Sequence, residues 1–386
     1  MEFRFTPEQT TIADSARGFL ATNVTPSSLQ TFIKNQATFD SALWDSMVHQ
    51  LGWPSVAVPE HLGGAGLGPV ELAILMQETG AALAPAPLFA TAALAIPAIL
   101  AAATPAQREH LLPAILAGAP ATLCFTNAHG IPGPEGVTAE LHPTGTTFRL
   151  TGTAGFVPHA VAAQHLVIAC RAPNSTGANA ISLIALPASH PGIKAMHHTT
   201  LDLTRPYSTL HFNNIDIPPL AILGQPHEAA PAFTHTLAFA AAMLAAEQLG
   251  GAERVLALSL DHTKQRKQFG RIIGSFQAIK HKLANMLLLV ESARAAAYYA
   301  ACTAAESPAD LPEAASIARA YCSEAYCRCA AEAIQIHGGM GFTWDSDCHL
   351  FYRRAKQIAG NIGSARYWRN RLIDRLLTQN ENIEAA

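Results

Sequence analysis

The pattern of apolar and polar residues along the chain divides it into three zones. From residue 1 to about 120, apolar residues recur at helical spacing. Residues 121–224 instead show short β-type runs that Gly, Pro and Asn interrupt. The helical period returns at residue 225 and continues in long segments through residues 225–386. The pattern therefore predicts a mainly α protein with an N-terminal helical domain (1–120), a small central β-barrel or sandwich (121–224) and a C-terminal four-helix bundle (225–386).

Capping and turn residues indicate the element boundaries. In the first zone, helices are expected to begin at Pro7, at Ser41 as N-cap, at Pro69, and at Thr104 followed by Pro105. The expected strands are Thr122–Thr126, Thr147–Thr153, His165–Ala169, Ile181–Leu186 and Ser208–Phe212. The expected C-terminal helices are Ala229–Arg266, Ser275–Ala305, Pro312–His337, 347–359 and 364–379. Long antiparallel helices of this kind are typical of a bundle.

Composition narrows the class of protein. The chain has 386 residues, of which 49% are hydrophobic and 14% charged, which favours helices that are buried on several sides or covered by another subunit. A net charge of −3 argues against nucleic-acid binding. The most apolar stretches are Ala-rich and interrupted by prolines such as Pro85 and Pro97, so no membrane span is expected. No secretory segment begins the chain, and we expect a cytoplasmic protein.

Cysteine usage gives no sign of a disulfide framework or a metal site. The chain has 7 cysteines, an odd number, and no secretory signal. Cys322, Cys327 and Cys329 lie in one helical stretch without the paired spacing or nearby histidines that a metal site needs. We therefore expect reduced cysteines that act as small apolar side chains, and no metal.

Two segments combine glycines with residues that suit a bound ligand. In Lys264–Gln277, a helix ends in a basic cluster, turns at Gly270 and begins again near Ser275. Arginine there suits phosphate recognition, and the alternative is a helix C-terminus capped by cations. In Gln335–Phe342, glycines follow a helix and either end it or let a ligand approach the backbone. The second segment is neither a Walker loop nor a Rossmann motif, because no strand precedes it.

Together, in this order and spacing, the two segments resemble motifs of the acyl-CoA dehydrogenase family. Arg266–Gln277 is similar to the family's R-x-Q-F-G…F-Q signature, and Ala333–Phe342 to its Q-x-x-G-G-x-G motif. Gly52–Gly64 resembles its N-terminal loop motif. The resemblance covers nearly the whole chain and agrees with the order of helical, β and helical zones. Residues 341–354 are similar to a bacterial subgroup that lacks the usual C-terminal catalytic glutamate and includes steroid side-chain acyl-CoA dehydrogenases.

This resemblance implies an FAD-dependent enzyme that removes an α-proton and a β-hydride from an acyl thioester. The implied substrate is an acyl-CoA, the electron acceptor is an electron-transfer flavoprotein or a similar protein, and the assembly is a homo- or heterotetramer with FAD bound across subunits. The residues expected to hold FAD lie in the two motifs and in the β zone: Arg266, Gln268, Phe269, Gln277, Gln335, Gly338, Gly339, Phe125, Thr126, Phe156 and Pro158. Thr126–Gly133 departs from the family's T-E-P-x-x-G-S-D pattern, which places the contacts of its Ser and Asp in doubt.

The usual catalytic glutamate is missing. Where the resemblance places it near the C-terminus, this chain has Ile362, whose backbone N–H is still expected to donate to the thioester carbonyl, and the second known location falls near Ala240. Two helical turns further, on the same helix face, Glu247 lies in an apolar stretch. A lone carboxylate there would be desolvated and basic, and it resembles a glutamate of the bacterial subgroup, so we predict Glu247 as the base. The alternative is that Glu247 pairs with a basic residue across the bundle.

Two other functions stay open at this point. A catalytically degenerate subunit of a heteromeric acyl-CoA dehydrogenase is favoured by Ile362 and by the altered Thr126–Gly133 segment, and opposed by the intact FAD motifs. A flavin oxidase or monooxygenase of the same fold is permitted by the missing glutamate.

Small residues at 238 and 240–242 suggest room for a bulky or branched acyl group. Arg353 and Arg354 either steer an anionic coenzyme or protein partner, or form helix salt bridges, which is the more frequent use of such pairs.

Overall fold

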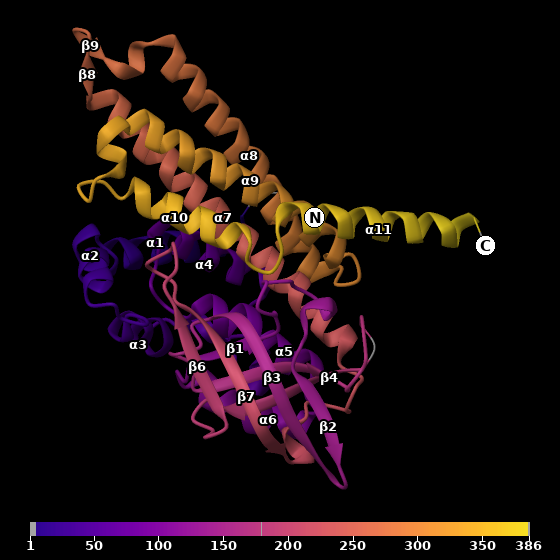
Figure 1. Ribbon diagram of the computed structural model, residues 1–386. Helices are drawn as coiled ribbons and strands as arrows, with labels where there is room; N and C mark the ends of the chain where they lie inside the picture. Colours follow the sequence, from indigo (N-terminus) through magenta and orange to yellow (C-terminus); the bar gives the residue numbers. More distant parts are fainter. Residues whose placement is uncertain (1–4, 179, 385–386) are drawn as a thin grey trace.

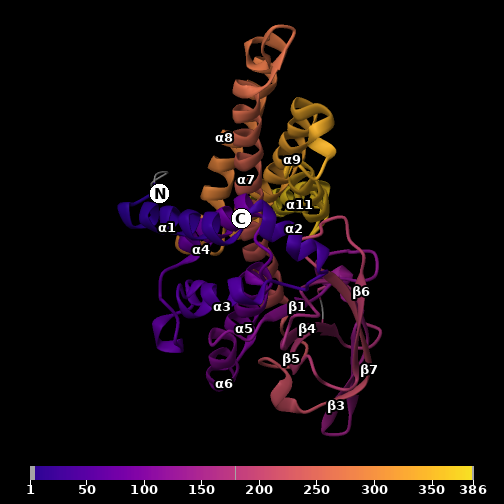
Figure 2. The same cartoon turned by 90° about the vertical axis from the view of Figure 1, so that its left-hand side faces the viewer.

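A layer of long C-terminal helices lies across a curled β-sheet and the N-terminal helices, which are side by side beneath it (Figures 1 and 2). The computed structural model describes residues 5–178 and 180–384. The predicted class, a mainly α chain with a central β element between two helical parts, is confirmed. The expected boundaries at residues 120 and 224 fall in connections between elements, and the division into three domains stays a prediction.

Threonine and aspartate caps begin the N-terminal helices. Thr6 and Thr104 each form a capping box, with Gln9 and Gln107 respectively, because their hydroxyls accept from the third backbone N–H of the helix. The expected N-cap Ser41 is wrong by one residue, since the Asp40 carboxylate accepts from the Leu43 N–H at 3.0 Å. The helices of this part are α1 (Pro7–Asn23), α2 (Pro26–Lys34), α3 (Ser41–His49), α4 (Pro69–Ala82), the π-helical segment Phe89–Ala95, α5 (Ile96–Ala102) and α6 (Pro105–Leu116).

The central sheet of the described residues has seven strands in the order β1-β4-β2-β3-β7-β6, with β5 paired to β4. The strands are β1 (Ala121–Cys124), β2 (Glu140–Thr144), β3 (Thr147–Pro158), β4 (His165–Arg171), β5 (Ile181–Pro187), β6 (Ile193–His198) and β7 (Tyr207–Ile217). β4 is buried on both faces: Leu166 and Ile168 point into the sheet's own core, and Val167 and Ala169 into the helical core. β2 and β6 were not expected, because β2 contains His142 and Pro143 and β6 is a largely exposed edge strand without apolar alternation.

The C-terminal helices begin and end within two residues of their expected bounds, except that α11 extends further. They are α7 (Ala230–Gln265), α8 (Gln277–Glu306), α9 (Leu311–His337), α10 (Cys348–Ala359) and α11 (Ala365–Glu384). α7 crosses α4 at backbone contact: a Cβ on Gly80 would lie 2.1 Å from the Glu247 carbonyl oxygen, and one on Gly250 would lie 1.8 Å from that of Gln77. These two glycines therefore fix the depth at which Glu247 is buried.

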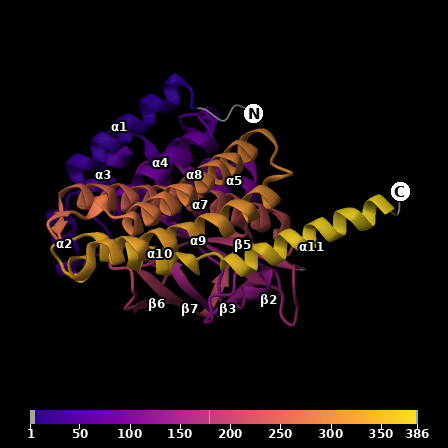
Figure 3. The same ribbon diagram turned by 90° about the horizontal axis from the view of Figure 1, so that it is seen from above.

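Two features extend from the ends of the helix layer. The short hairpin of β8 (Lys267–Gln268) and β9 (Arg271–Ile272) joins α7 to α8 at one end, and α11 projects from the other (Figures 1 and 3). Among the described residues, no helix is long and apolar enough to cross a membrane.

Candidate functional site

Glu247 lies at the centre of a buried ion cluster, which comprises Asp202, Arg205, Glu247 and Arg354. Glu247 is 1% exposed, and its oxygens accept from Arg205 Nη2 at 2.8 Å each and from Arg354 Nη1 at 2.7 Å. The other edge of Arg354 donates to the Asp202 carboxylate and, at 2.6 Å, to the Thr204 hydroxyl. Two carboxylates thus face two guanidinium groups, and the charges of the cluster balance.

The expectation that Glu247 is a lone, basic carboxylate is wrong. Burial by itself would raise its pKa, but the charges of Arg205 and Arg354 and their hydrogen bonds outweigh burial and lower the pKa below its ordinary value. The pKa of Arg354 moves the opposite way, because Asp202 and Glu247 outweigh the effect of burial. A carboxylate held in its charged form by two arginines is a poor proton acceptor at neutral pH. The structure thus agrees with the alternative prediction, in which Glu247 pairs with a basic residue.

The cluster joins three parts of the chain. Asp202 and Arg205 come from the connection between β6 and β7, Glu247 from α7, and Arg354 from α10. Of the two uses predicted for Arg354, the structure shows the salt bridge. No local pattern in the sequence marks Arg205 as a partner of Glu247. Arg205 also lies over the ring of Phe89, with 5.3 Å from its guanidinium carbon to the ring centroid.

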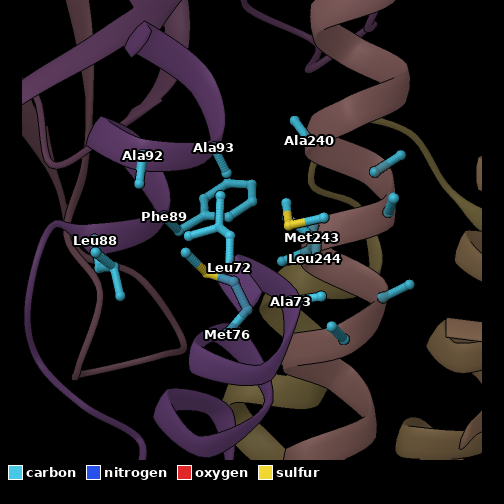
Figure 4. Packing of buried hydrophobic residues seen from close by; sticks show 14 of the residues in the cluster. Leu72, Ala73, Met76, Leu88, Phe89, Ala92, Ala93, Ala240, Met243 and Leu244 are labelled. Atoms are coloured by element: carbon cyan, nitrogen blue, oxygen red, sulfur yellow. The ribbon is translucent and has the colours of Figure 1, made fainter. Parts of the chain in front are cut away.

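The face of α7 that precedes Glu247 is packed against the N-terminal helices. Ala238, Ala240, Ala241 and Ala242 are all buried, and Figure 4 shows Phe89, Leu72 and Met76 facing Ala240, Met243 and Leu244. The small side chains let the helices approach closely, and the neighbouring side chains fill the space beside them. The structure thus gives the alanines a packing role.

Ile362 lies in the connection between α10 and α11, in a strained conformation. Its φ is 46°, in the left-handed region that β-branched residues rarely adopt. Its carbonyl accepts from Trp368 Nε1 at 2.9 Å, and the buried Arg319 holds the connection by donating to the carbonyls of Ile358 and Asn361. Within residues 5–178 and 180–384, the Ile362 N–H has no hydrogen-bond acceptor. The loop therefore presents a donor without a partner, as the prediction for the thioester carbonyl requires, and no carboxylate.

The two predicted glycine-containing motifs together line an open cleft beside the hairpin, of about 490 Å³. We call it the hairpin cleft. Its lining residues are His262, Arg266, Gln268, Phe269, Ile273, Phe276, Ile279, Ile336, His337, Gly338, Gly339 and Met340. It unites five of the predicted FAD residues, from the end cap of α7, the hairpin and the glycine segment. Gln277 and Gln335 are not among the lining residues, and both are exposed.

Phe269 is held in the hairpin turn with its ring in solvent. Phe269 and Gly270 form a two-residue turn with φ of 52° and 77°, and both central residues of such a turn need positive φ. The Phe269 side chain is 92% exposed. Glycine or asparagine is the ordinary choice at this position, so a phenylalanine there is strained by about 1–3 kcal/mol. A strained, exposed aromatic ring indicates a contact that the single chain does not provide.

The glycines and Arg266 of the hairpin cleft also lack partners among the residues that the structure describes. A Cβ added to Gly338 or Gly339 would meet no atom within 4 Å, so space, not packing, lies above this backbone. In the described residues the Arg266 side chain has no ion pair. The N-terminus of the 30-residue α8 adds a positive dipole end beside Phe276. The cleft thus offers a free guanidinium, a helix N-terminus and an aromatic ring, a combination that suits a nucleotide diphosphate.

The four predicted flavin residues of the β zone lie elsewhere. The Thr126 hydroxyl donates to the Gly155 carbonyl, which places Thr126 beside Phe156. Phe156 has φ of 48°, is partly exposed, and stacks on His198 at 5.6 Å. Phe125 and Pro158 are buried. The hairpin and the sheet lie at opposite ends of the molecule in Figure 2, so one chain does not bring the two groups into one site.

Comparisons with known proteins identify the family. Residues 6–119 match the model of the acyl-CoA dehydrogenase N-terminal domain, and residues 230–377 match that of the C-terminal domain. The acyl-CoA dehydrogenase IpdE2 of Mycobacterium tuberculosis (strain ATCC 25618 / H37Rv) is 31% identical over 93% of this chain and 94% of its own length. The chain therefore belongs to the acyl-CoA dehydrogenase family and is an FAD-dependent oxidoreductase of that kind.

Two similar solved structures are described by a pair of protein names each. The ChsE4–ChsE5 complex of Mycobacterium tuberculosis contains a chain that is 26% identical, with a TM-score of 0.87 over 98% of this chain and 99% of that one. A variant of the Tcur3481–Tcur3483 steroid ACAD is 29% identical, with a TM-score of 0.84 over 97% of this chain and 99% of that one. The resemblance to the family and to its steroid-related members is thereby confirmed.

Proposed function

We propose that this chain serves the FAD-dependent α,β-dehydrogenation of an acyl-CoA as one of two kinds of subunit in a hetero-oligomer. In this proposal its hairpin cleft holds the diphosphate and adenosine part of an FAD shared with a partner subunit, and the partner supplies the base. FAD, when bound, supplies the hydride acceptor of the reaction. The observation that carries the proposal is the pairing of both Glu247 oxygens with Arg205 and Arg354.

The absence of a free acid at the expected places supports a partner's base. Removal of an α-proton beside a thioester needs a carboxylate whose pKa is raised by a dry, unpaired environment. Glu247 is dry but paired, and its pKa is lowered. Ile362 has no titratable group, and Ala240 none either. Neither of the family's known base positions carries an acid in this chain.

The exposed hairpin supports an FAD site that is shared between subunits. Arg266, Phe269 and the Gly338–Gly339 backbone face a cleft that stays open in the described part of the chain. A second subunit placed over the hairpin end would cover the Phe269 ring, and the phenylalanine in its strained turn would then be explained. The two-chain complexes among the similar structures are consistent with such an arrangement.

The relatives also point to a class of substrate and to an acceptor. One similar structure is described as a steroid ACAD, which favours a bulky, ring-bearing acyl-CoA over a short linear one. We further propose an electron-transfer flavoprotein or a similar flavoprotein as the electron acceptor, and a tetramer of two plus two subunits.

Purification of the chain alone and together with a second acyl-CoA dehydrogenase chain tests the assembly. Flavin absorbance and anaerobic bleaching by acyl-CoA are expected only with both chains.

A competing version keeps Glu247 of this chain as the base, with the Ile362 N–H as donor to the thioester carbonyl. Glu247→Gln distinguishes the two versions, and Asp202→Asn is its matched control because both changes remove one carboxylate from Arg354. If the role of Glu247 is structural, both variants lose stability, and both still bleach the flavin once normalised to bound FAD. Loss of bleaching in Glu247→Gln alone would contradict the proposal and establish Glu247 as the base.

A further inference from the structure

Two histidines stack on each other inside the hairpin cleft. The rings of His262, near the end of α7, and His337, at the end of α9, have centroids 4.2 Å apart and planes at 26°. Both residues line the cleft together with Arg266 and Gly338. The predicted FAD residues include neither histidine, although His337 lies within the Ala333–Phe342 motif.

Hydrogen bonding fixes the proton position on His337. Its Nδ1 lies 2.8 Å from the Ala333 carbonyl oxygen, and a carbonyl only accepts, so Nδ1 carries a hydrogen. Cys348 Sγ of α10 lies 3.5 Å from the same nitrogen. Nε2 has no partner among the described residues. In the neutral ring Nε2 is an acceptor, and after protonation it becomes a charged donor to anything bound in the cleft.

Partial burial and the neighbouring charges disfavour protonation of His262 until an anion arrives. Of the cleft-lining side chains, Arg266 is the one with a permanent charge, and the lining residues of α8 and of the segment before it, Ile273, Phe276 and Ile279, are apolar. α10 presents the thiol of Cys348, and its pKa is raised chiefly by burial. The pKa of His262 is lowered by partial burial and then by the neighbouring His337 and Arg266. An acidic partner for the two imidazoles is not among the lining residues, so a bound anion would be the balancing charge.

We propose that the His262–His337 pair is a proton-linked phosphate contact, in which one imidazole takes up a proton as the FAD diphosphate enters the hairpin cleft. Proton uptake then couples the hold on FAD to pH. This inference rests on the proposed function, because it takes the diphosphate of FAD as the occupant of the cleft. It adds His262 and His337 to the residues that are predicted to bind FAD.

The direction of the pH dependence follows from linkage. A nearby phosphate favours the charged imidazole, so the histidine pKa is higher in the FAD complex than in the free cleft. Affinity for FAD is therefore greatest at acid pH and falls as the pH rises between the two pKa values. For one linked proton the dissociation constant increases by up to about tenfold per pH unit in that interval.

The experiment is a titration of FAD into flavin-depleted protein, with its partner chain where one is needed for assembly, followed by flavin fluorescence. Titrations from about pH 5.5 to about pH 8.5 cover the ordinary range of histidine. Calorimetry in two buffers of different ionisation enthalpy counts the protons taken up. The variants are His262→Phe, which keeps the stacked ring, and His337→Gln, which keeps a donor for the Ala333 carbonyl. His61→Gln, an exposed histidine of another segment, is the matched control.

We expect the wild type and His61→Gln to bind FAD more weakly as the pH rises, with net proton uptake. Both cleft variants should fold, as judged by circular dichroism. They should bind FAD with a constant that depends less on pH than that of the wild type, and take up fewer protons. A wild-type constant that does not change with pH, or cleft variants that retain the full dependence, would overturn the histidine proposal and leave the shared FAD site standing. Failure of the assembled wild type to bind FAD at any pH would instead defeat the proposed function, and the histidine proposal with it.

Discussion

The buried ion cluster around Glu247 and the hairpin cleft around Phe269 both use arginine, yet they differ in what completes them. In the ion cluster, two carboxylates and two guanidinium groups are buried and pair with one another, although Arg205 Nε and Nη1 have no hydrogen-bond partner among the described residues. In the hairpin cleft, Arg266 has no counter-ion in the described chain, and the Phe269 ring is in solvent. The pairing of Glu247 with two arginines favours a structural role for this carboxylate, and we propose that the open hairpin cleft is the site of a ligand.

The largest expected effect breaks the ion cluster. Glu247→Ala leaves two buried guanidinium groups without their shared carboxylate, which should lower the free energy of unfolding by about 3–5 kcal/mol. Urea denaturation followed by circular dichroism measures this loss. Glu291→Ala, an exposed member of a surface pair, is the control and should change stability by less than about 1 kcal/mol. A similarly small change for Glu247→Ala would show that the cluster does not hold the β6–β7 connection to the helices.

In the hairpin cleft we expect the opposite: a substitution that weakens FAD binding and leaves the stability of the chain nearly unchanged. Arg266→Ala removes the one permanent charge that lines the cleft, and charge-assisted hydrogen bonds contribute about 1.5–3 kcal/mol, so FAD should bind about ten- to a hundredfold more weakly. The free energy of unfolding should change little, because Arg266 has no ion pair in the described residues. Flavin fluorescence and urea denaturation provide the two readouts. Unchanged FAD affinity would remove the cleft from the cofactor site.

Acid should destabilise the chain through the ion cluster. The pKa of Glu247 is lowered from an ordinary value of 4.5, so its stabilising contribution is complete above that value and is lost as the pH falls through the lower, folded-state pKa. The wild type should therefore lose more stability on acidification below about pH 4.5 than Glu247→Gln does. Denaturation curves at successive pH values test this expectation. Parallel acid profiles for the two proteins would argue against an ionised Glu247 in the folded state.

The smallest expected effect concerns strain in the hairpin turn. Phe269→Gly removes a side chain from a residue with φ of 52° and should leave stability unchanged or raise it by up to about 1 kcal/mol, while weakening the hold on FAD. Gly270→Ala, at the neighbouring φ of 77°, is the matched control and should lower stability by a similar amount. Thermal unfolding of both variants is the measurement. A marked loss of stability in Phe269→Gly would mean that the ring packs within this chain.

Much of the fold can be predicted from local sequence pattern. Where the prediction of an element fails, the cause is also local. The long helices and five of the strands lie close to their expected positions, because helical and alternating periods are strong over such lengths. β2 and β6 were missed, since β6 is an exposed edge strand and β2 contains a proline. The FAD motif residues Arg266, Gln268, Phe269, Gly338 and Gly339 do meet in one cleft. The stacked His337 belongs to the same motif, but its partner His262 carries no signal of its own.

What the sequence by itself determined is the order of elements, the motifs and the absence of acids at positions 240 and 362. Those properties depend on residue identity and on spacing within single elements. The tertiary structure alone decided the state of Glu247, because its partners Arg205 and Arg354 come from a loop before β7 and from α10. A pKa depends on charges that are close in space, and an apolar stretch in sequence does not reveal which charges the fold brings to it.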